Sequence, residues 1–205
     1  MTKTNQQKVK DFLINNGVII VMFILVIYTG FTSDNFFTKN NFMNILMNMS
    51  SRLVIALGIA GCVITAGCDL SAGRMIGFGA CISGMLLQRM DYSGKFFPDM
   101  QPLNVFVVAL IAMLVCAAFG TVTGFFIAYL NVPPFIATLA MMEIVYGIGL
   151  IVTNATPLGG YVEQYTNVSN GKFLGINYLI WIAIIVAAIT WFIFNMTRHG
   201  KYMYA

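Results

Sequence analysis

Charged and polar side chains gather at one point in an otherwise apolar stretch of the chain. The segment "TAGCDLSAGR", residues 65–74, places Asp69, Ser71 and Arg74 within six positions of one another. A charge at the centre of a bilayer costs roughly 2.5–3.5 kcal/mol on insertion scales, so such charges usually face a polar interior or a path for solutes. Glu143, the one charge in residues 134–153, is a second candidate of the same kind. These four residues are the candidates for a translocation path or a gate.

Local structure offers another interpretation of the same segment. Gly67 suits the end of one helix, and Asp69 or Ser71 suits the start of the next, where a side-chain oxygen accepts from free backbone N–H groups. Gly67 and Gly73 then act as helix-breaking residues on either side of a capped hairpin. Direct contact with a substrate and a surface for a partner remain alternatives for Asp69. For Glu143 the alternative is a buried hydrogen bond to a neighbouring helix.

The composition sets the class of protein. Of the 205 residues, 59% are hydrophobic and 9% are charged, and the mean hydropathy is +0.84. An average soluble domain carries roughly 25% charged residues, so this chain is predicted to be a membrane protein. Its apolar blocks are long and uniform, whereas barrel strands alternate polar and apolar residues. We therefore expect an all-α, polytopic transmembrane helical bundle.

The lengths of the apolar blocks predict about six spans in a single transmembrane domain, residues 1–205. A bilayer core of about 30 Å needs roughly 20 helical residues. Residues 53–90 would form a straight helix of about 57 Å, which is too long for one crossing, so the chain must turn back around residues 67–74. The expected spans are residues 12–31, 48–66, 73–90, 104–130, 134–153 and 178–196.

Two further patterns concern helix ends and helix packing. Pro133 and Pro134 end the fourth span, because proline supplies no backbone donor and disfavours the helical conformation of the preceding residue. Gly120, Gly124 and Ala128 recur at four-residue spacing, which lines small residues on one face and lets another helix approach. Chance in a glycine-rich chain is the alternative for this small-residue stripe.

Six crossings place both termini on one side of the membrane. The positive-inside rule then favours a cytoplasmic N-terminus, because basic residues lie near both ends of the chain. The asymmetry is small, with six basic residues inside (Lys3, Lys8, Lys10, Arg74, Arg198, Lys201) against five outside (Lys39, Arg52, Arg89, Lys95, Lys172).

Catalytic, metal and nucleic-acid functions find little support in the sequence. The chain has no Walker, HExxH or GxSxG motif, so we expect neither an enzyme nor an ATP site of its own. Its single histidine, His199, sits in a basic tail, and its four cysteines lie in apolar blocks without metal-binding spacing. No basic patch suited to nucleic acid is present.

Several motifs together resemble a known family. "VIALGIAGCVITAGCDLSAGRMIGFGA" and "GFFIAYLNVPPFIATLAMMEIVYGI" look like permease subunits of bacterial ABC sugar importers, close to the ribose and galactose branch. "DLSAGR", together with "LLQRMD" and the "TR.GK" pattern of "TRHGK", narrows the resemblance within that branch. The galactose/methyl-galactoside permeases are the most similar group. The resemblance runs from the first span to Lys201.

That resemblance implies a subunit that forms a sugar path without covalent chemistry. It implies a permease dimer in the bacterial cytoplasmic membrane, a sugar-binding protein outside the cell, and a separate cytoplasmic ATPase that binds ATP and Mg. It also implies that the chain corresponds to about the first 60% of such a permease and stops before the loop that docks on the ATPase. A secondary transporter or channel using Asp69 and Glu143, and a non-transporting membrane scaffold, remain alternatives.

Overall fold

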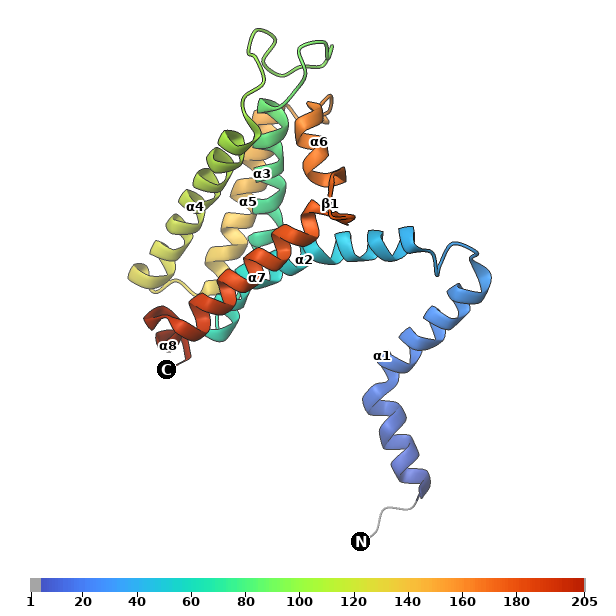
Figure 1. Ribbon diagram of the computed structural model, residues 1–205. Helices are drawn as coiled ribbons and strands as arrows, with labels where there is room; N and C mark the ends of the chain where they lie inside the picture. The colour runs from blue at the N-terminus through green and yellow to red at the C-terminus, as the bar shows by residue number, and fades with distance from the viewer. Residues whose placement is uncertain (1–4, 205) are drawn as a thin grey trace. The chain divides into compact units, whose positions relative to one another are not determined.

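The computed structural model describes residues 5–204 and divides into two compact units. The units are Met1–Asn48 and Met49–Ala205, and the helix α2 (Lys39–Ile64) runs through the boundary between them. Each unit is described by itself (Figure 1).

The first unit contains α1 (Asn5–Thr32), a short turn and the beginning of α2. The second span was expected to begin at residue 48, but α2 begins nine residues earlier. The Thr38 hydroxyl accepts from the backbone N–H of Asn41 (3.3 Å), and the Asn41 side chain donates to the Phe36 carbonyl (2.8 Å). These bonds satisfy polar groups at the start of the helix, which explains its early start.

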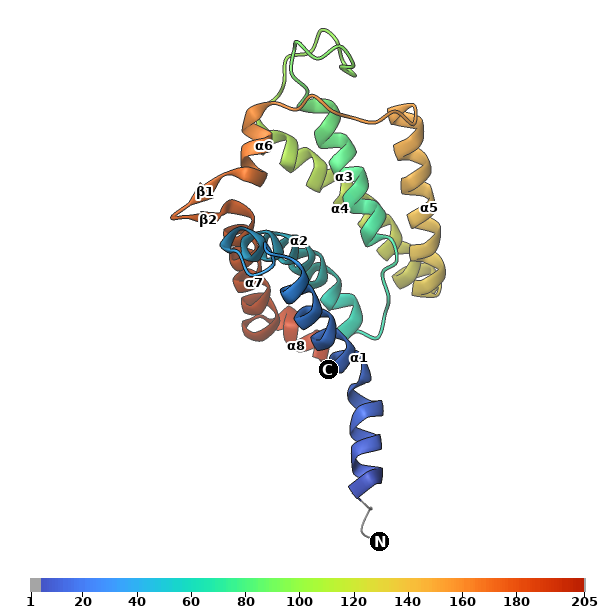
Figure 2. The ribbon, with the colours of Figure 1, turned by 90° about the vertical axis from the view of Figure 1, so that its right-hand side faces the viewer.

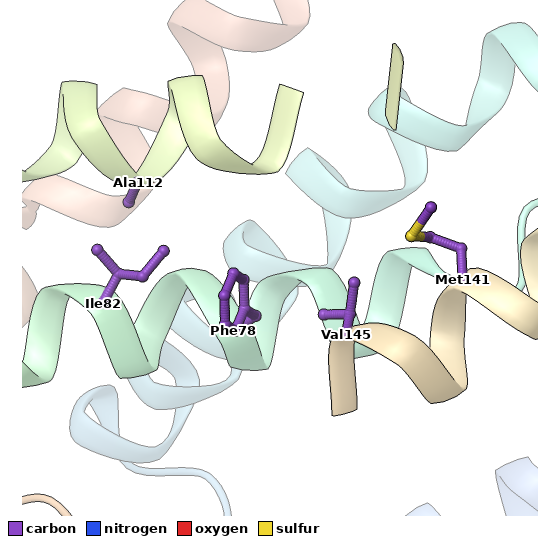
Figure 3. Packing of buried hydrophobic residues seen from close by; sticks show 5 residues of the cluster. All are labelled: Phe78, Ile82, Ala112, Met141 and Val145. Carbon is purple, nitrogen blue, oxygen red and sulfur yellow. The ribbon is translucent and has the colours of Figure 1, made fainter. Parts of the chain in front are cut away.

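The second unit is built around three helices that run alternately up and down. They are α3 (Ala72–Leu86), α4 (Val105–Leu130) and α5 (Pro134–Thr153), and α3 packs against both of the others (Figure 2). Side chains from all three meet in one apolar cluster (Figure 3). The partly buried ring of Phe119 packs edge to face against that of Phe78, with centroids 5.6 Å apart. The buried members are Phe78, Ile82, Ala112, Met141 and Val145.

The helix α3 is shorter than the third expected span, residues 73–90. It ends at Leu86 because the next residues leave the helix to pair with a distant segment. Gln88 forms an isolated antiparallel bridge with Tyr161, and the Val162 N–H donates to the Leu87 carbonyl (2.9 Å). A contact between segments more than 70 residues apart therefore sets the end of this helix.

The segment after α5 is more structured than its composition indicated. Residues 154–177 were expected only to connect the fifth and sixth spans, but they contain α6 (Glu163–Asn170) and a hairpin of β1 (Lys172–Phe173) and β2 (Ile176–Asn177). The helices α7 (Tyr178–Met196) and α8 (Arg198–Tyr204) follow. A polar helix of eight residues carries no long apolar run, so span length alone could not reveal it.

Asparagine and proline residues define most of the remaining helix ends. Asn104 and Asn177 accept from N–H groups in the first turns of α4 and α7. Asn131 ends α4 in the left-handed conformation with φ 53°, and Pro133 and Pro134 stand at the start of α5. α5 and α7 consequently have the bounds expected for the fifth and sixth spans.

Five helices of the described chain are long and apolar enough to cross a membrane, and α3 is a shorter apolar helix of 15 residues. The prediction of a polytopic helical bundle with a break around residues 67–74 is confirmed. The five long segments are Leu13–Thr32, Lys39–Ile64, Val105–Leu130, Pro134–Thr153 and Tyr178–Met196.

Candidate functional site

The turn between α2 and α3 begins with a defined helix C-terminus. Ala66, with φ 57°, takes the left-handed conformation, and its N–H donates to the Val63 carbonyl (3.1 Å). The N–H of Gly67 reaches back to the Cys62 carbonyl at 2.8 Å. This pair of bonds is a Schellman motif, which satisfies carbonyls at the end of α2. The residue in the left-handed conformation is therefore Ala66 and not Gly67. A Cβ added at Gly67 would lie 3.2 Å from the Cys62 carbonyl oxygen, so the absence of a side chain at Gly67 leaves room for that oxygen.

Asp69 and Ser71 form the polar centre of this turn. One carboxylate oxygen of Asp69, Oδ1, accepts from both the backbone N–H of Ser71 (2.9 Å) and its hydroxyl (2.6 Å). Ser71 occupies the N-cap position of α3 and is 5% exposed, but its hydroxyl donates to Asp69 and does not cap the helix. Asp69 therefore organises the residue before α3, close to the positive end of the helix dipole.

The turn forms one end of a groove between α2, α3 and α4. The groove has a volume of about 620 Å³ and belongs entirely to the second unit. Asp69 and Ser71 are the polar side chains that line it, and the remainder of the lining is largely apolar or small. Cys116 faces it from α4, with its thiol 3.6 Å from the carbonyl of Met75. The small lining residues are Gly58, Ala72, Gly79, Ala112 and Gly120.

Arg74 lies apart from Asp69 although the two are close in the sequence. Its guanidinium carbon is 4.0 Å from the ring centroid of Tyr146 on α5, a cation–π contact. Both residues line a smaller hollow of about 220 Å³ between α3 and α5. The structure thus brings Asp69 and Ser71 together and places Arg74 in a second hollow.

Glu143 lines neither hollow. It is exposed on α5, and it makes no hydrogen bond or ion pair with another residue that the structure describes, so the expected buried hydrogen bond to a neighbouring helix is absent there.

For the translocation role expected from the sequence, replacing Glu143 by Gln should leave uptake by the complete transport system within about twofold of the unaltered level, because the side chain lines neither hollow. Initial uptake rates at matched membrane expression check this. Abolished uptake with normal expression would show that the Glu143 charge has a role that this packing does not reveal.

The other candidate residues have mixed outcomes. Gly73 lies in the first turn of α3 and does not break the helix, contrary to our expectation.

The small-residue stripe on α4 lies at the surface of the described chain. Gly120, Gly124 and Ala128 are exposed, and a Cβ built at either glycine meets nothing within 4 Å in the described chain. Only Gly120 of the three lines the groove. Helix packing against the small-residue stripe stays a prediction.

Two residues that sequence reasoning missed lie at the far end of α3. Gln88 is 1% exposed and bonds to two different loops. Tyr92 packs against Gly159 and Gly160. The motif "LLQRMD" contained Gln88, but nothing in its composition indicated a partner 71 residues away.

Comparison with known proteins supplies the family. Residues 41–205 match the protein family described as branched-chain amino acid transport system / permease component. The chain belongs to this family. Individual proteins similar to this chain also confirm its resemblance to permease subunits of ABC sugar importers.

The relatives are import permeases for sugars. The galactose/methyl galactoside import permease protein MglC of Escherichia coli (strain K12) is 37% identical over 212 residues, covering 100% of this chain and 63% of the relative. MglC of Haemophilus influenzae is 38% identical, with the same coverages. The ribose import permease protein RbsC of Escherichia coli (strain K12) is 30% identical over 96% of this chain and 59% of its own length. The chain thus spans about 60% of the length of these relatives. No solved structure matches it.

Proposed function

We propose that this chain forms part of the translocation path of an ATP-driven sugar importer. The observation that carries the proposal is the 37% identity to MglC over the whole chain, and the name of that relative gives galactose or methyl galactoside as its substrate. The name of RbsC gives ribose, so the proposed class of substrate is galactose, methyl galactoside or a related monosaccharide. The groove with Asp69 and Ser71 at one end is the proposed section of the path.

The proposed mechanism requires no covalent step. A sugar is a neutral polyol, and on entering the path it must exchange some of its hydrogen bonds to water for hydrogen bonds to the residues that line the path. Asp69 Oδ1 already accepts two hydrogen bonds from Ser71, which leaves Oδ2 to accept from a sugar hydroxyl. The small and apolar remainder of the groove offers few further partners, so the sugar keeps part of its water shell and is held weakly as it passes.

The proposed partners supply energy and substrate. A separate ATPase on the cytoplasmic side binds ATP and Mg, and a second permease chain completes the path. A sugar-binding protein delivers substrate from outside. The chain contributes no ATP-binding motif to this assembly, so its proposed role is that of a transport subunit.

The proposed location is the bacterial cytoplasmic membrane, with the N-terminus inside the cell and six crossings. In that orientation the Asp69 turn and the α4–α5 turn face the cytoplasm. Residues 87–104 and 154–177 then face outward. The alternating directions of α3, α4 and α5 place these two long connections at the same end of the unit (Figure 1), so both lie on one side of the membrane in this arrangement.

Uptake of radiolabelled galactose in cells carrying the complete transport system tests the proposal. We expect uptake to require the ATPase and to survive a protonophore. Proton-dependent uptake that persists without the ATPase would contradict an ATP-driven importer and support a secondary transporter.

A further inference from the structure

The helix α3 begins deep within the length of its neighbour α4. The thiol of Cys116 lies 3.6 Å from the carbonyl oxygen of Met75, and Cys116 is the twelfth of the 26 residues of α4. At 1.5 Å per residue, Cys116 is about 21 Å from the end of α4 at Leu130, and Ala72 lies about 5 Å closer to that end than Met75 does. The first residue of α3 is therefore about 16 Å from the level at which α4 ends.

Contacts with α5 place the start of α3 at the same depth. Arg74 on α3 contacts Tyr146, which is the thirteenth of the 20 residues of α5 and lies about 18 Å from its start. Figure 2 shows the connection after α2 rising to the start of α3, above the lower ends of α4 and α5. The turn that contains Asp69 thus lies within the length of the membrane-spanning helices.

Three charged side chains lie near this depth. They are Asp69, Arg74 and Glu143, the tenth residue of α5. A charge near the centre of a bilayer is costly and usually faces the interior of a bundle or a water-filled cavity. Non-helical backbone at that depth, such as residues 65–71, is likewise tolerated only where protein or water surrounds it. These polar groups therefore mark a level at which water reaches the unit.

The hydrogen-bond donors of Arg74 are unused among the residues that the structure describes. No carboxylate there lies within ion-pair distance of Arg74, and its guanidinium carbon lies 4.0 Å from the ring centroid of Tyr146. A cation–π contact uses none of the five N–H donors of an arginine. The charge also stands in the first turn of α3, at the positive end of the helix dipole, where it is unfavourable. A ligand that accepts hydrogen bonds would offset this cost.

The hollow beside Arg74 has the size and lining of a site for one small molecule. Its volume of about 220 Å³ is below the roughly 300–1,000 Å³ of sites for drug-sized ligands. Gly77 and Gly149 leave space in its walls, and Phe78 and Val145 of the apolar cluster (Figure 3) also line it. Mostly apolar walls with a few polar groups are usual for small-molecule sites.

The hollow and the groove lie on opposite faces of α3. Residues 72, 76 and 79 of α3 line the groove, whereas residues 74, 78 and 81 line the hollow. At 3.6 residues per turn, these two sets point to opposite sides of the helix. The hollow is therefore a separate site from the Asp69 end of the groove, at about the same depth.

The charges at this depth favour a neutral ligand in the hollow. Arg74 is positive, whereas Asp69 and Glu143 are negative, so the two carboxylates offset the attraction of one guanidinium for an anion. A monosaccharide is neutral, and its hydroxyl oxygens accept hydrogen bonds from a guanidinium. Its C–H groups can pack against the apolar walls. Charge and lining thus favour a sugar over an anionic solute.

We propose that the hollow between α3 and α5 is a sugar subsite at mid-membrane depth, in which Arg74 donates hydrogen bonds to the hydroxyl groups of one monosaccharide. Tyr146 holds the guanidinium of Arg74 in place and leaves its N–H donors free for the ligand. The identity of the ligand rests on the proposed importer function. The subsite and the groove flank α3, and both belong to the proposed path.

The reactivity of Cys81, which lines the hollow, reports whether a sugar occupies it. In the complete transport complex, Cys62, Cys68 and Cys116 are replaced by serine, and the reaction of Cys81 with N-ethylmaleimide is followed without ATP at increasing galactose concentration. Galactose at about ten times its half-protecting concentration should slow labelling about tenfold. Sucrose, a disaccharide too large for the hollow, should leave the rate unchanged.

Variants of Arg74 test its role as a ligand of the sugar. Arg74→Ala removes the donors and is expected to raise the half-protecting galactose concentration at least about tenfold. Arg74→Lys keeps a charged donor but loses the planar group, so a smaller increase is expected. Arg89→Ala is the matched control, because Arg89 does not line the hollow and pairs with Asp91 at 3.5 Å. Its half-protecting concentration should equal that of the unaltered complex.

The outcomes distinguish this inference from the importer function. If the complete system shows no ATP-dependent uptake of galactose, the proposed function fails. If uptake occurs but Cys81 is unreactive, or is not protected by galactose, or is protected equally by sucrose, the subsite is overturned. An unchanged half-protecting concentration in Arg74→Ala would overturn it too. Should Arg74→Ala not assemble, Arg74→Lys decides, and an unchanged value in that variant overturns the subsite.

Discussion

Asp69→Ala is expected to lower sugar uptake by at least about tenfold. The substitution removes the acceptor of two hydrogen bonds and leaves the hydroxyl of Ser71, which is 5% exposed, without that partner. Hydrogen bonds to a charged group contribute about 1.5–3 kcal/mol each, and about 1.4 kcal/mol corresponds to a factor of ten. The turn that precedes α3 and forms one end of the groove would lose the hydrogen bonds that hold Ser71 in place. Initial uptake rates at equal membrane expression measure the effect.

Asp69→Asn separates the charge from the hydrogen bonds. Its amide oxygen still accepts from Ser71, so the turn should form, while the negative charge near the start of α3 and the free Oδ2 acceptor are lost. We expect uptake between that of the unaltered protein and that of Asp69→Ala. Full uptake in both variants would show that Asp69 has only a packing role.

Filling the groove is the second change with a large expected effect. Gly120 lines the groove, and a Cβ built there meets nothing within 4 Å in the described chain. The Cβ of a leucine at this position therefore meets no described neighbour, and its side chain adds bulk at the lining of the proposed path. Gly120→Leu is expected to reduce uptake by at least about tenfold, through obstruction and not through unfolding.

Gly124→Leu is the matched control, one helical turn farther along α4. Gly124 is equally open but does not line the groove. Uptake should persist in this variant and fall in Gly120→Leu, with both chains present in the membrane at normal levels. Loss of assembly in both variants would instead identify the small-residue stripe as a helix-packing face and contradict the assignment of the groove to the path.

Features set by local chemistry were predictable from the sequence. Pro133 and Pro134 act on their own neighbours, so the start of α5 was predicted to the residue. Tyr178, which follows the cap residue Asn177, was likewise predicted to begin the sixth span. The turn around Asp69 followed from the length of the apolar run, because no bilayer accommodates a helix of about 57 Å.

Features set by distant contacts were not predictable in this way. α3 ends at Leu86 because residues 87 and 88 bond to residues 159–162. The sequence placed Asp69 and Arg74 among the candidates for one path or gate, whereas Arg74 lies over the ring of Tyr146 on α5 and lines a different hollow. The left-handed residue at the end of α2 is Ala66, although glycine at position 67 was the residue that local preference favoured.

The reactivity of Cys116 tests most directly whether the groove belongs to a sugar path. With Cys62, Cys68 and Cys81 replaced by serine, Cys116 is the single thiol of the chain and lines the groove. A charged, membrane-impermeant methanethiosulfonate is applied to the complete transport complex, with and without turnover of galactose and ATP. We predict that Cys116 reacts, because the path admits water, and that its labelling rate changes during turnover. A Cys116 thiol that stays unreactive in both conditions, while transport continues, would contradict the assignment.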